Sequence, residues 1–422
     1  MNSLNPEILS LGGQYEHVAE KYRPIFARIQ QGALKREQNR QLPLQEIQWL
    51  KQAGFGAVRI PVAFGGDGLS QKQLFQLLIE LAKADSNIVQ ALRGHFAFVE
   101  DRLNAHKFAD QSHWFQRFVK GDLVGNAWTE VGQVEIGDVI TRVKENKAGE
   151  LIVNGEKFYS TGTIYADWID LFALDETTGQ HVIAAVSTHE QGVNVQDDWD
   201  GFGQKTTGSG TLKVVNVPIE RDHIYNFDTR FRYQTAFYQV VHLATLAGIA
   251  QSAVETFSDE VRKRTRIFSH GNAPLVRHDP QVLQVIGKAS AQAYAAEHIA
   301  LAAAAALDDA YYNHFHGSHD LVDEANDRAE LESSQGQVVI SDLVLQLTSD
   351  LFNTLGASAS STAKQLDRFW RNARVVSSHN PLIYKQKVIG DWEVNQAPLP
   401  FVWQIGNSPL AKKLDNKNDA LV

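Results

Sequence analysis

The spacing of apolar residues in the first part of the chain is that of amphipathic helices. Four leucines recur three or four residues apart between Gln71 and Asp85, namely Leu74, Leu77, Leu78 and Leu81. Ser70 stands directly before this run and can accept a hydrogen bond from the first free N–H groups of a helix. The segment "LQEIQWLKQAGFG" ends in glycine, which is typical of the end of a helix. The pattern predicts helices from Tyr15 to about Gln116.

The pattern changes to short β-rich runs at about Asp122. Two such runs flank Lys147-Ala148-Gly149 in "DVITRVKENKAGELIVNGEKFYS", which predicts a hairpin. Further short strands are predicted in "WIDLFAL", "HVIAAVST" and "GTLKVVNVPI". We therefore expect a β domain over residues 122–231, between a helical domain over residues 1–121 and another over residues 232–422.

Long helical patterns return after Arg232. The segments "FYQVVHLATLAGIAQSAVETFSDEVRKRTR" and "PQVLQVIGKASAQAYAAEHIALAAAAALDDAYY" are rich in alanine, and such helices pack closely side by side in a bundle. We expect "HFHGSHDLVDEANDRAE" to be a polar connection, followed by a helix in "QGQVVISDLVLQLTSDLFNTLG" and another in "STAKQLDRFWRNAR".

Composition excludes several classes of function. The chain has 422 residues, of which 43% are hydrophobic, enough for a large core, and a net charge of −9 with scattered Lys and Arg. This argues against binding to nucleic acid or to an anionic membrane surface. The first residues lack the basic and apolar stretches of a secretory signal, and we expect a cytoplasmic protein.

Sulfur-containing residues are nearly absent. The chain has no Cys, and its one Met is Met1. Thiolate nucleophiles, disulfides and cysteine-bound zinc are therefore excluded. A protein made when sulfur is scarce would benefit from such a composition, although compositional drift would give the same result.

Several segments occur in the order found in one enzyme family. They are "GNAWTEVG" from Gly125 to Gly132, "NGEKFYSTGT" from Asn154 to Thr163, "GFGQKTTGSGTLKVVNVPI", and "RKRTRIF" from Arg262 to Phe268. The chain resembles the acyl-CoA dehydrogenase superfamily in these segments and in their order. The resemblance implies an α+β fold that is mostly α: an N-terminal helical domain, a middle β-barrel or β-sandwich domain, and a C-terminal four-helix bundle.

The segments "FYSTGT", "DDWDGFGQ" and "SSHNP" resemble one branch of that superfamily. This branch contains flavin-dependent monooxygenases such as dibenzothiophene monooxygenase and related sulfur-acquisition oxidoreductases. The resemblance implies a homotetramer that takes reduced FMN from a separate NAD(P)H-dependent flavin reductase, with FAD as the alternative. It further implies that O2 and the reduced flavin form a C4a-hydroperoxide, which oxygenates a small organosulfur compound.

A dehydrogenase of this superfamily needs a carboxylate base, and neither expected segment contains one. Residues 375–384, "VVSSHNPLIY", have no Asp or Glu, and residues 231–254 have none either. This argues against oxidation of an acyl-CoA. Two alternatives stay open: an FAD-dependent acyl-CoA dehydrogenase with a relocated base, and a flavoprotein without catalytic activity.

Small polar residues and histidines are the candidates for oxygen chemistry, because they can hydrogen-bond a reactive oxygen species in a dry pocket. The catalytic candidates are Asn126, Ser160, Thr161, His379 and His95. A histidine titrates near working pH, so His379 is expected to donate a proton. Alternatively, His379 only binds the flavin phosphate or caps a helix, and His95 is a satisfied core residue.

The resemblance also suggests which residues hold the cofactor. Trp128 and Thr129 match positions that meet the flavin ring, Trp199 is a candidate wall, and one of Arg264 and Arg266 is expected to reach a neighbouring subunit's cofactor. Further candidates for the phosphate are Arg371, Ser377 and Ser378. The loop "HFHGSHD" contains three histidines but no matching carboxylate pattern, so we expect no metal site.

Overall fold

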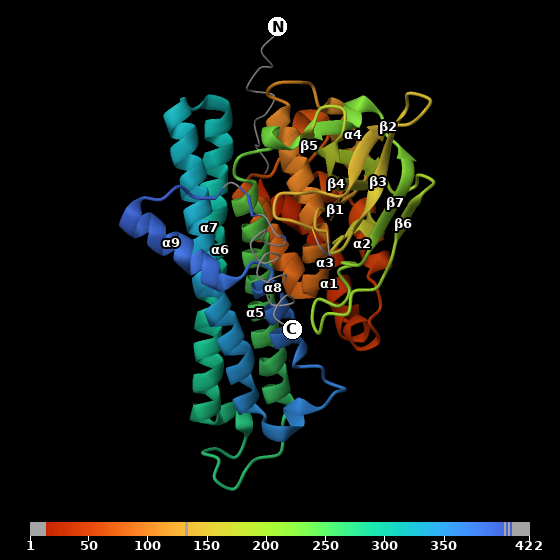
Figure 1. The fold of residues 1–422 in the computed structure, drawn as a ribbon. Coiled ribbons are helices and arrows are strands. Elements are labelled where there is room, and N and C mark those ends of the chain that lie inside the picture. Colours follow the sequence, from red (N-terminus) through yellow and green to blue (C-terminus); the bar gives the residue numbers. More distant parts are fainter. Residues whose placement is uncertain (1–13, 131–133, 401, 404–405, 407–422) are drawn as a thin grey trace, which may run out of the picture.

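The computed structural model describes residues 14–130, 134–400, 402–403 and 406. Helices come first and last along the chain, and the strands lie between them (Figure 1). The N-terminal helices are α1 (Tyr15–Asn39), α2 (Leu44–Gln52), α3 (Gln71–Ala105) and α4 (Ser112–Lys120). The structure thus confirms the predicted helical beginning of the chain.

Helix α3 begins as the sequence predicts. The Ser70 side chain accepts from the backbone N–H of Gln73, and the Gln73 side chain accepts from the Ser70 N–H, so both free donors are satisfied. The helix is interrupted at Asp85, where φ is −159° and ψ is 107°. The Asp85 carboxylate binds Arg36 of α1 at 2.8 Å, which ties the kink to the neighbouring helix.

The strands form one eight-stranded mixed sheet, in which β1 pairs in parallel with β4 beside the order β6-β7-β3-β2-β4-β5-β8. The predicted hairpin is confirmed, since β2 and β3 are antiparallel and Gly149 has the positive φ of its turn. The strands are β1 (Val124–Ala127), β2 (Arg142–Glu145), β3 (Leu151–Lys157), β4 (Trp168–Asp175), β5 (Gln180–Ser187), β6 (Val193–Val195), β7 (Leu212–Pro218) and β8 (Ile224–Asn226).

The C-terminal helices are α5 (Gln234–Lys263), α6 (Pro280–His316), α7 (His319–Asp350), α8 (Arg368–Ser377) and α9 (Leu382–Asn395). Helices α5 to α8 run alongside one another, and α9 projects away from them (Figure 1). The expected polar connection "HFHGSHDLVDEANDRAE" is wrong, because only Gly317 and Ser318 separate α6 from α7. Its alanines Ala325 and Ala329 are buried against the bundle, and this packing outweighs the polar composition. Residues 361–367 are likewise not helical, so α8 is shorter than predicted.

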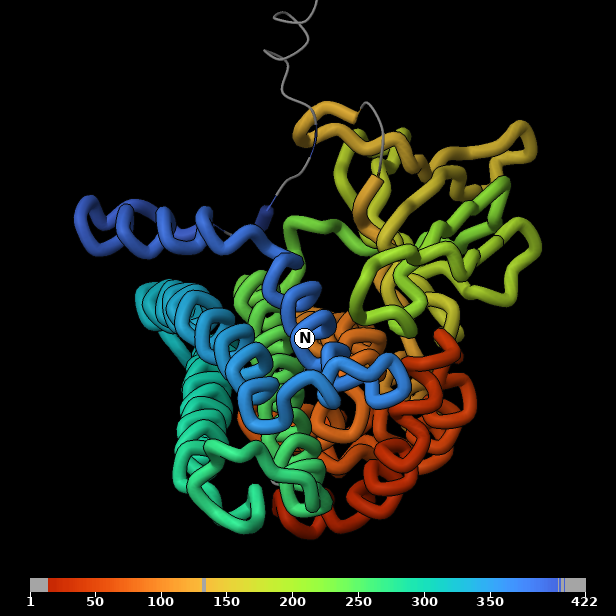
Figure 2. The backbone as a smooth tube through the Cα atoms, turned by 90° about the horizontal axis from the view of Figure 1, so that it is seen from below, coloured from red at the N-terminus to blue at the C-terminus, as the bar shows by residue number. Residues whose placement is uncertain are grey.

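The described residues form two apolar cores. One runs without interruption through the N-terminal and C-terminal helices, and the other lies within the sheet. Viewed along the bundle, α3 lies between the other N-terminal helices and α5 (Figure 2). Helix α5 is long and apolar enough to cross a membrane by length and composition, but 72% of its most apolar window is buried inside the protein. This burial is that of a core helix.

Candidate active site

The two segments expected to face a flavin lie side by side. The N–H of Phe158 donates to the carbonyl of Thr129 at 3.0 Å, and the N–H of Asn126 donates to the carbonyl of Thr161 at 3.2 Å. The last two residues of the segment "GNAWTEVG", 131 and 132, lie outside the described residues. These bonds bring β1 and the loop after β3 together at one edge of the sheet.

Helix α3 packs very closely against β1 at Gly94. A Cβ atom at Gly94 would lie only 2.5 Å from the Cβ of Asn126, so any larger residue would push the helix away from the strand. The same helix approaches the loop after β3, where Gly162 faces the carbonyl of Ala91. This contact brings Arg93, the residue before Gly94, to the junction of the sheet and the bundle.

Four side chains from three parts of the chain meet at this junction: Arg93 of α3, Tyr238 and His242 of α5, and His379 directly after α8. We call them the arginine–histidine cluster. Arg93 Nη1 lies 2.9 Å from His379 Nε2, and the His379 and His242 rings are 4.4 Å apart. The Arg93 guanidinium also lies 5.2 Å from the centre of the Tyr238 ring, a cation–π contact.

The hydrogen bond from Arg93 fixes the proton on His379. A guanidinium only donates, so His379 Nε2 accepts, and the neutral ring carries its proton on Nδ1, 3.4 Å from Asn380 Oδ1. Burial, followed by the charge of Arg93, lowers the pKa of His379 to about 3. The expectation of a pKa near working pH is therefore wrong for the protein without ligands, because the adjacent cation opposes a second positive charge.

The two histidines of the cluster, His379 and His242, differ in their exposure to solvent. The His379 side chain is exposed, yet burial is the main cause of its lowered pKa. His242, by contrast, is only 1% exposed, and burial holds its pKa well below the usual value.

Two buried polar atoms of the cluster have no partner among the described residues. They are Nε of Arg93 and Nε2 of His242. Such atoms are rare in folded proteins, because an unsatisfied buried polar group is costly. The neighbouring Asn126 is also buried, and its Nδ2 contacts the Tyr238 hydroxyl at the long distance of 3.5 Å. The cluster therefore has unused hydrogen-bonding capacity.

Trp128 forms an aromatic wall beside the cluster. Its Nε1 donates to Asp170 at 3.0 Å, the Arg230 guanidinium lies 4.9 Å from its ring, and the Tyr238 ring packs edge-on at 5.6 Å. These contacts fix the orientation of the indole. Trp128 and Thr129 are only half-buried, so part of this wall is open.

His95 does not belong to this site. It is completely buried, its Nδ1 accepts from the N–H of Val124, and its Nε2 donates to the carbonyl of Gly56 at 2.8 Å. The catalytic assignment of His95 is therefore corrected to a structural one. Two residues of helix correspond to about 200° of rotation, so His95 faces away from the side on which Arg93 lies.

Ser160 and Thr161 are near the site but their hydroxyls are occupied. Ser160 Oγ donates to the carbonyl of Gly210 at 2.7 Å, and Thr161 Oγ1 shares a hydrogen bond with Ser209 Oγ at 2.8 Å. Both residues are buried. These bonds hold the loop after β3 onto the loop before β7.

Three of the proposed phosphate ligands are also already bonded within the chain. Arg371 binds the carboxylates of Glu37 and Asp367, each at 2.8 Å. Ser377 and Ser378 donate to the carbonyl of Arg374, as is common for serine at the end of a helix. The structure therefore argues against Arg371, Ser377 and Ser378 as free phosphate ligands.

The remaining cofactor candidates lie apart from the cluster. Trp199 Nε1 donates to the carbonyl of Gln204 at 3.1 Å, and its ring packs on Tyr159. Arg264 and Arg266 follow the far end of α5, roughly 33 Å along the helix from His242 at about 1.5 Å per residue. Arg264 donates to Ser358 at 2.9 Å, and Arg266 is exposed. Neither arginine reaches the cluster within one chain.

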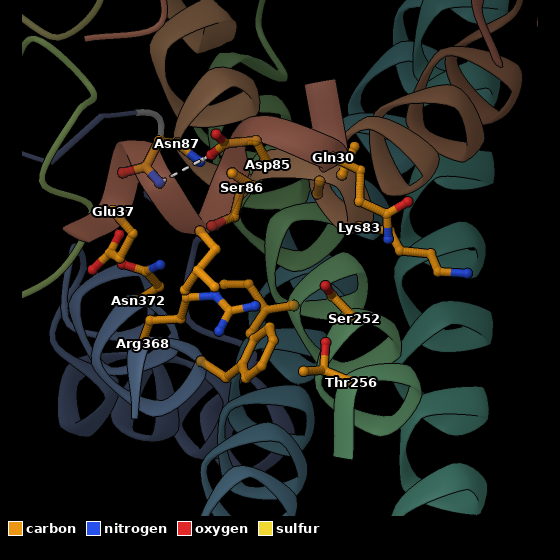
Figure 3. A pocket seen from close by; sticks show the side chains of 16 residues that line it. Gln30, Glu37, Lys83, Asp85, Ser86, Asn87, Ser252, Thr256, Arg368 and Asn372 are labelled. Atoms are coloured by element: carbon orange, nitrogen blue, oxygen red, sulfur yellow. Dashed lines mark hydrogen bonds between the residues drawn. The ribbon is translucent and has the colours of Figure 1, made fainter. Parts of the chain in front are cut away.

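A polar cleft of about 190 Å³ lies along the same helices (Figure 3). Its lining includes Asn87 of α3, Ile249 of α5 and Asn372 of α8. The cleft is therefore lined by the two helices that carry Arg93 and His242 and by the helix that precedes His379.

Sequence reasoning missed Arg93, Tyr238 and His242. Arg93 stands in "RGHFAF", but the sequence does not tell which of its polar residues faces the site. Tyr238 and His242 are four residues apart and so share one helix face. A histidine within the otherwise apolar segment "FYQVVHLATLAGIA" was the one available signal.

No group of three or more His, Asp or Glu side chains that could hold a metal ion occurs in the described part of the chain. In the histidine-rich segment, His314 Nε2 lies 3.1 Å from the carbonyl of Asn104, and His319 pairs with Asp323 at 3.2 Å. His314 therefore joins α6 to the end of α3, and His319 forms an exposed pair within the first turn of α7.

Comparison with known proteins agrees with this architecture. Residues 240–382 match the family described as acyl-CoA dehydrogenase, C-terminal domain. The chain is 26% identical over 386 residues to the probable FMNH2-dependent monooxygenase SfnC of Pseudomonas putida, covering 90% of this chain and 95% of that protein. It is 25% identical over 382 residues to a dibenzothiophene monooxygenase of Mycolicibacterium goodii, covering 84% and 88% of the two chains.

A solved structure shares the whole fold. The methanesulfinate monooxygenase MsuC of Pseudomonas fluorescens superimposes with a TM-score of 0.81 and 26% identity, over 90% of this chain and 98% of that one. The order of helices, mixed sheet and helices is thus common to both. The C-terminal part of the chain thus matches the acyl-CoA dehydrogenase C-terminal domain, and most of the chain is similar to flavin-dependent monooxygenases.

Proposed function

We propose that this protein is a two-component, FMNH2-dependent monooxygenase that oxygenates a small organosulfur compound in sulfur acquisition. The relatives support the reduced flavin and the organosulfur substrate, because they are described as using FMNH2 and as acting on dibenzothiophene or methanesulfinate. The near absence of sulfur from the sequence agrees with synthesis under sulfur limitation.

The observation that carries the proposal is the replacement of both possible bases by neutral histidines. His379 and His242 come from the two segments in which a dehydrogenase of this superfamily has its glutamate, and their rings are in contact. The carboxylates nearby are committed: Asp170 to Trp128 and Arg230, and Glu130 to Lys157 at 2.7 Å. A carboxylate free to remove a carbon-bound proton is not found among the described residues of this site, so oxidation of an acyl-CoA is not favoured.

The donor set at the junction fits a reduced flavin. Trp128 offers a fixed and half-open aromatic wall, and Thr129 and Asn126 stand beside it. The unpartnered Nε2 of His242 and Nε of Arg93 leave buried polar atoms for a polar ligand. When bound, the reduced flavin supplies the two electrons by which one atom of O2 enters the substrate and the other leaves as water.

The chain's own residues then have three tasks. Asn126 orients the bound oxygen species through its side-chain amide. His379 holds one proton on Nδ1 while Arg93 keeps Nε2 as an acceptor, so the ring stays neutral beside the reacting atoms. Ser160 and Thr161 hold the loop after β3 in place and so help exclude water.

We further propose a homotetramer in the cytoplasm, with a separate NAD(P)H-dependent flavin reductase as its partner. The position of Arg264 and Arg266 supports assembly, since both lie far from the cluster of their own chain. In an assembly, one of them is expected to reach the flavin phosphate of a neighbouring subunit.

The experiment mixes the protein with reduced FMN under anaerobic conditions and then with O2 and a panel of organosulfur compounds. We expect an oxygenated sulfur product whose new oxygen comes from isotopically labelled O2. The His379→Ala variant is expected to lower the yield of product per O2 consumed by roughly 100-fold, with hydrogen peroxide appearing instead. The matched control is His17→Ala, an exposed histidine of α1.

Two results would contradict the proposal. The first is reoxidation of FMN at the rate of free flavin, with no product from any compound. The second is tight binding of FAD together with its reduction by an acyl-CoA, which would instead indicate a dehydrogenase with a relocated base.

A further inference from the structure

Arg93 differs from every other buried arginine among the described residues. Five arginines are buried: Arg36, Arg59, Arg93, Arg102 and Arg230. Four of them form an ion pair with a carboxylate: Arg36 with Asp85, Arg59 with Glu100, Arg102 with Asp101, and Arg230 with Asp170. Arg93 is only 5% exposed, and its polar contacts are neutral ones, to His379 and to the Tyr238 ring.

A buried charge without a counter-charge is costly, because the low-dielectric interior does not restore the favourable hydration free energy that the ion loses. Burial accordingly lowers the pKa of Arg93, with the Tyr238 hydroxyl as the opposing influence. Such a residue marks a candidate site for an anion. The other four arginines show that this chain otherwise pairs its buried guanidinium groups.

The free donor capacity of Arg93 lies beside the reacting centre. Nη1 donates to His379 at 2.9 Å, while Nε has no partner among the described residues. His242 Nε2, also without a partner among the described residues, belongs to the ring that lies tilted against His379 at 4.4 Å. A guanidinium presents its N–H groups in a planar fork that matches two oxygen atoms of one oxyanion.

The charge of the cluster sets the charge of its ligand. Both histidines are neutral at working pH, so Arg93 contributes the single formal charge of the cluster. A monoanion neutralises this charge completely, whereas a phosphate dianion would leave an uncompensated negative charge in a buried site.

We propose that Arg93 binds the anionic oxygen atoms of the substrate, and that the substrate is a small organosulfur monoanion of the sulfinate or sulfonate class. The proposal rests on the proposed function for the reaction that follows, but not for the binding itself. The same oxyanion chemistry could come from the phosphate of the cofactor, and the experiment separates the two sources.

The first arm measures binding to the flavin-free protein by calorimetry. Each probe anion has a neutral partner of similar shape: methanesulfinate with dimethyl sulfoxide, and methanesulfonate with dimethyl sulfone. We expect at least one anion to bind about 10- to 100-fold more tightly than its neutral partner, as charge-assisted hydrogen bonds require. The Arg93→Gln variant is expected to lose this preference, and Arg93→Lys to retain part of it.

The control is Arg328→Gln, which removes one positive charge from the exposed surface of α7 and is expected to leave the preference unchanged. Circular dichroism of each variant checks folding. Equal affinity of anions and neutral partners for the wild-type protein would overturn the proposal, and so would an unchanged preference in Arg93→Gln.

The second arm compares FMN with riboflavin, which lacks the phosphate. If Arg93 binds the substrate, Arg93→Gln weakens FMN and riboflavin equally or not at all. A loss confined to FMN would assign Arg93 to the cofactor phosphate and overturn the proposal. Because both arms measure binding without turnover, a failure of the monooxygenase reaction leaves their result readable, and the two conclusions fail independently.

Discussion

The two halves of helix α3 face two buried polar regions of opposite design. Toward its C-terminal end lies a charged network, in which Arg59 pairs with Glu100, and Tyr233 donates to the same carboxylate at 2.6 Å. Toward its middle lies the arginine–histidine cluster, whose Arg93 has no carboxylate. Both regions contain a buried arginine, so burial alone does not distinguish a structural site from a functional one. The two regions differ in whether the buried arginine is paired with a carboxylate.

The largest effect is expected from breaking a pair in the charged network. Arg59→Gln leaves Glu100, which is completely buried, without its cation and should lower the free energy of unfolding by about 3–5 kcal/mol. Arg93→Gln leaves no buried charge without its counter-ion, and it should change the free energy of unfolding by less than about 0.5 kcal/mol or raise it. Urea unfolding of both flavin-free variants checks this difference. Equal destabilisation would make Arg93 a structural residue.

His95 is a structural histidine, and its contribution to the free energy of unfolding is expected to depend on pH. Burial lowers the pKa of His95 to about 4 from the usual 6.5. The unfolded chain therefore binds a proton between these values that the folded chain does not. Stability from His95 is fully present above pH 6.5 and is lost as pH falls toward 4, by about 3 kcal/mol in total.

Unfolding of the wild-type protein and of His95→Asn across this pH range measures that loss. The variant is expected to be less stable at neutral pH but to show a shallower decrease as pH falls. A slope identical to that of the wild-type protein would mean that His95 is already protonated in the fold.

The smallest effects are expected at Tyr233, which belongs to the charged network, and at Tyr238, which belongs to the arginine–histidine cluster. Tyr233→Phe removes a short bond to a buried carboxylate and should cost about 1.5–3 kcal/mol of stability. Tyr238→Phe removes only the 3.5 Å contact with Asn126, at the limit of hydrogen-bond geometry, and should change kcat/KM by less than about fivefold. A large catalytic loss in Tyr238→Phe would show that the hydroxyl contacts the substrate or the flavin.

The sequence predicted the order of the elements because each element carries its own local signal. Leucine spacing with Ser70 as cap predicted α3, and the turn at Gly149 predicted the β2–β3 hairpin. The polar segment before α7 was misjudged, since its helix is stabilised by burying alanines against a neighbour that local composition does not reveal.

The site was only partly predictable, and for a different reason. The sequence alone shows that residues 375–384, which include His379, contain no Asp or Glu, because this depends only on residue types. The partners of His379 could not be read, since Arg93 and His242 are 149 residues apart along the chain and meet only through packing of α3 on α5. His95 was one of the candidates, whereas Arg93, two positions earlier on α3, is the residue that contacts His379.

The sequence by itself determined the elements, the missing base and the family resemblance, because these depend on residue types and short-range spacing. Only the tertiary structure decided which buried charges have partners. Ion pairing depends on distances between side chains that are far apart in sequence, and a guanidinium with no carboxylate within reach becomes visible only when all its neighbours are in place.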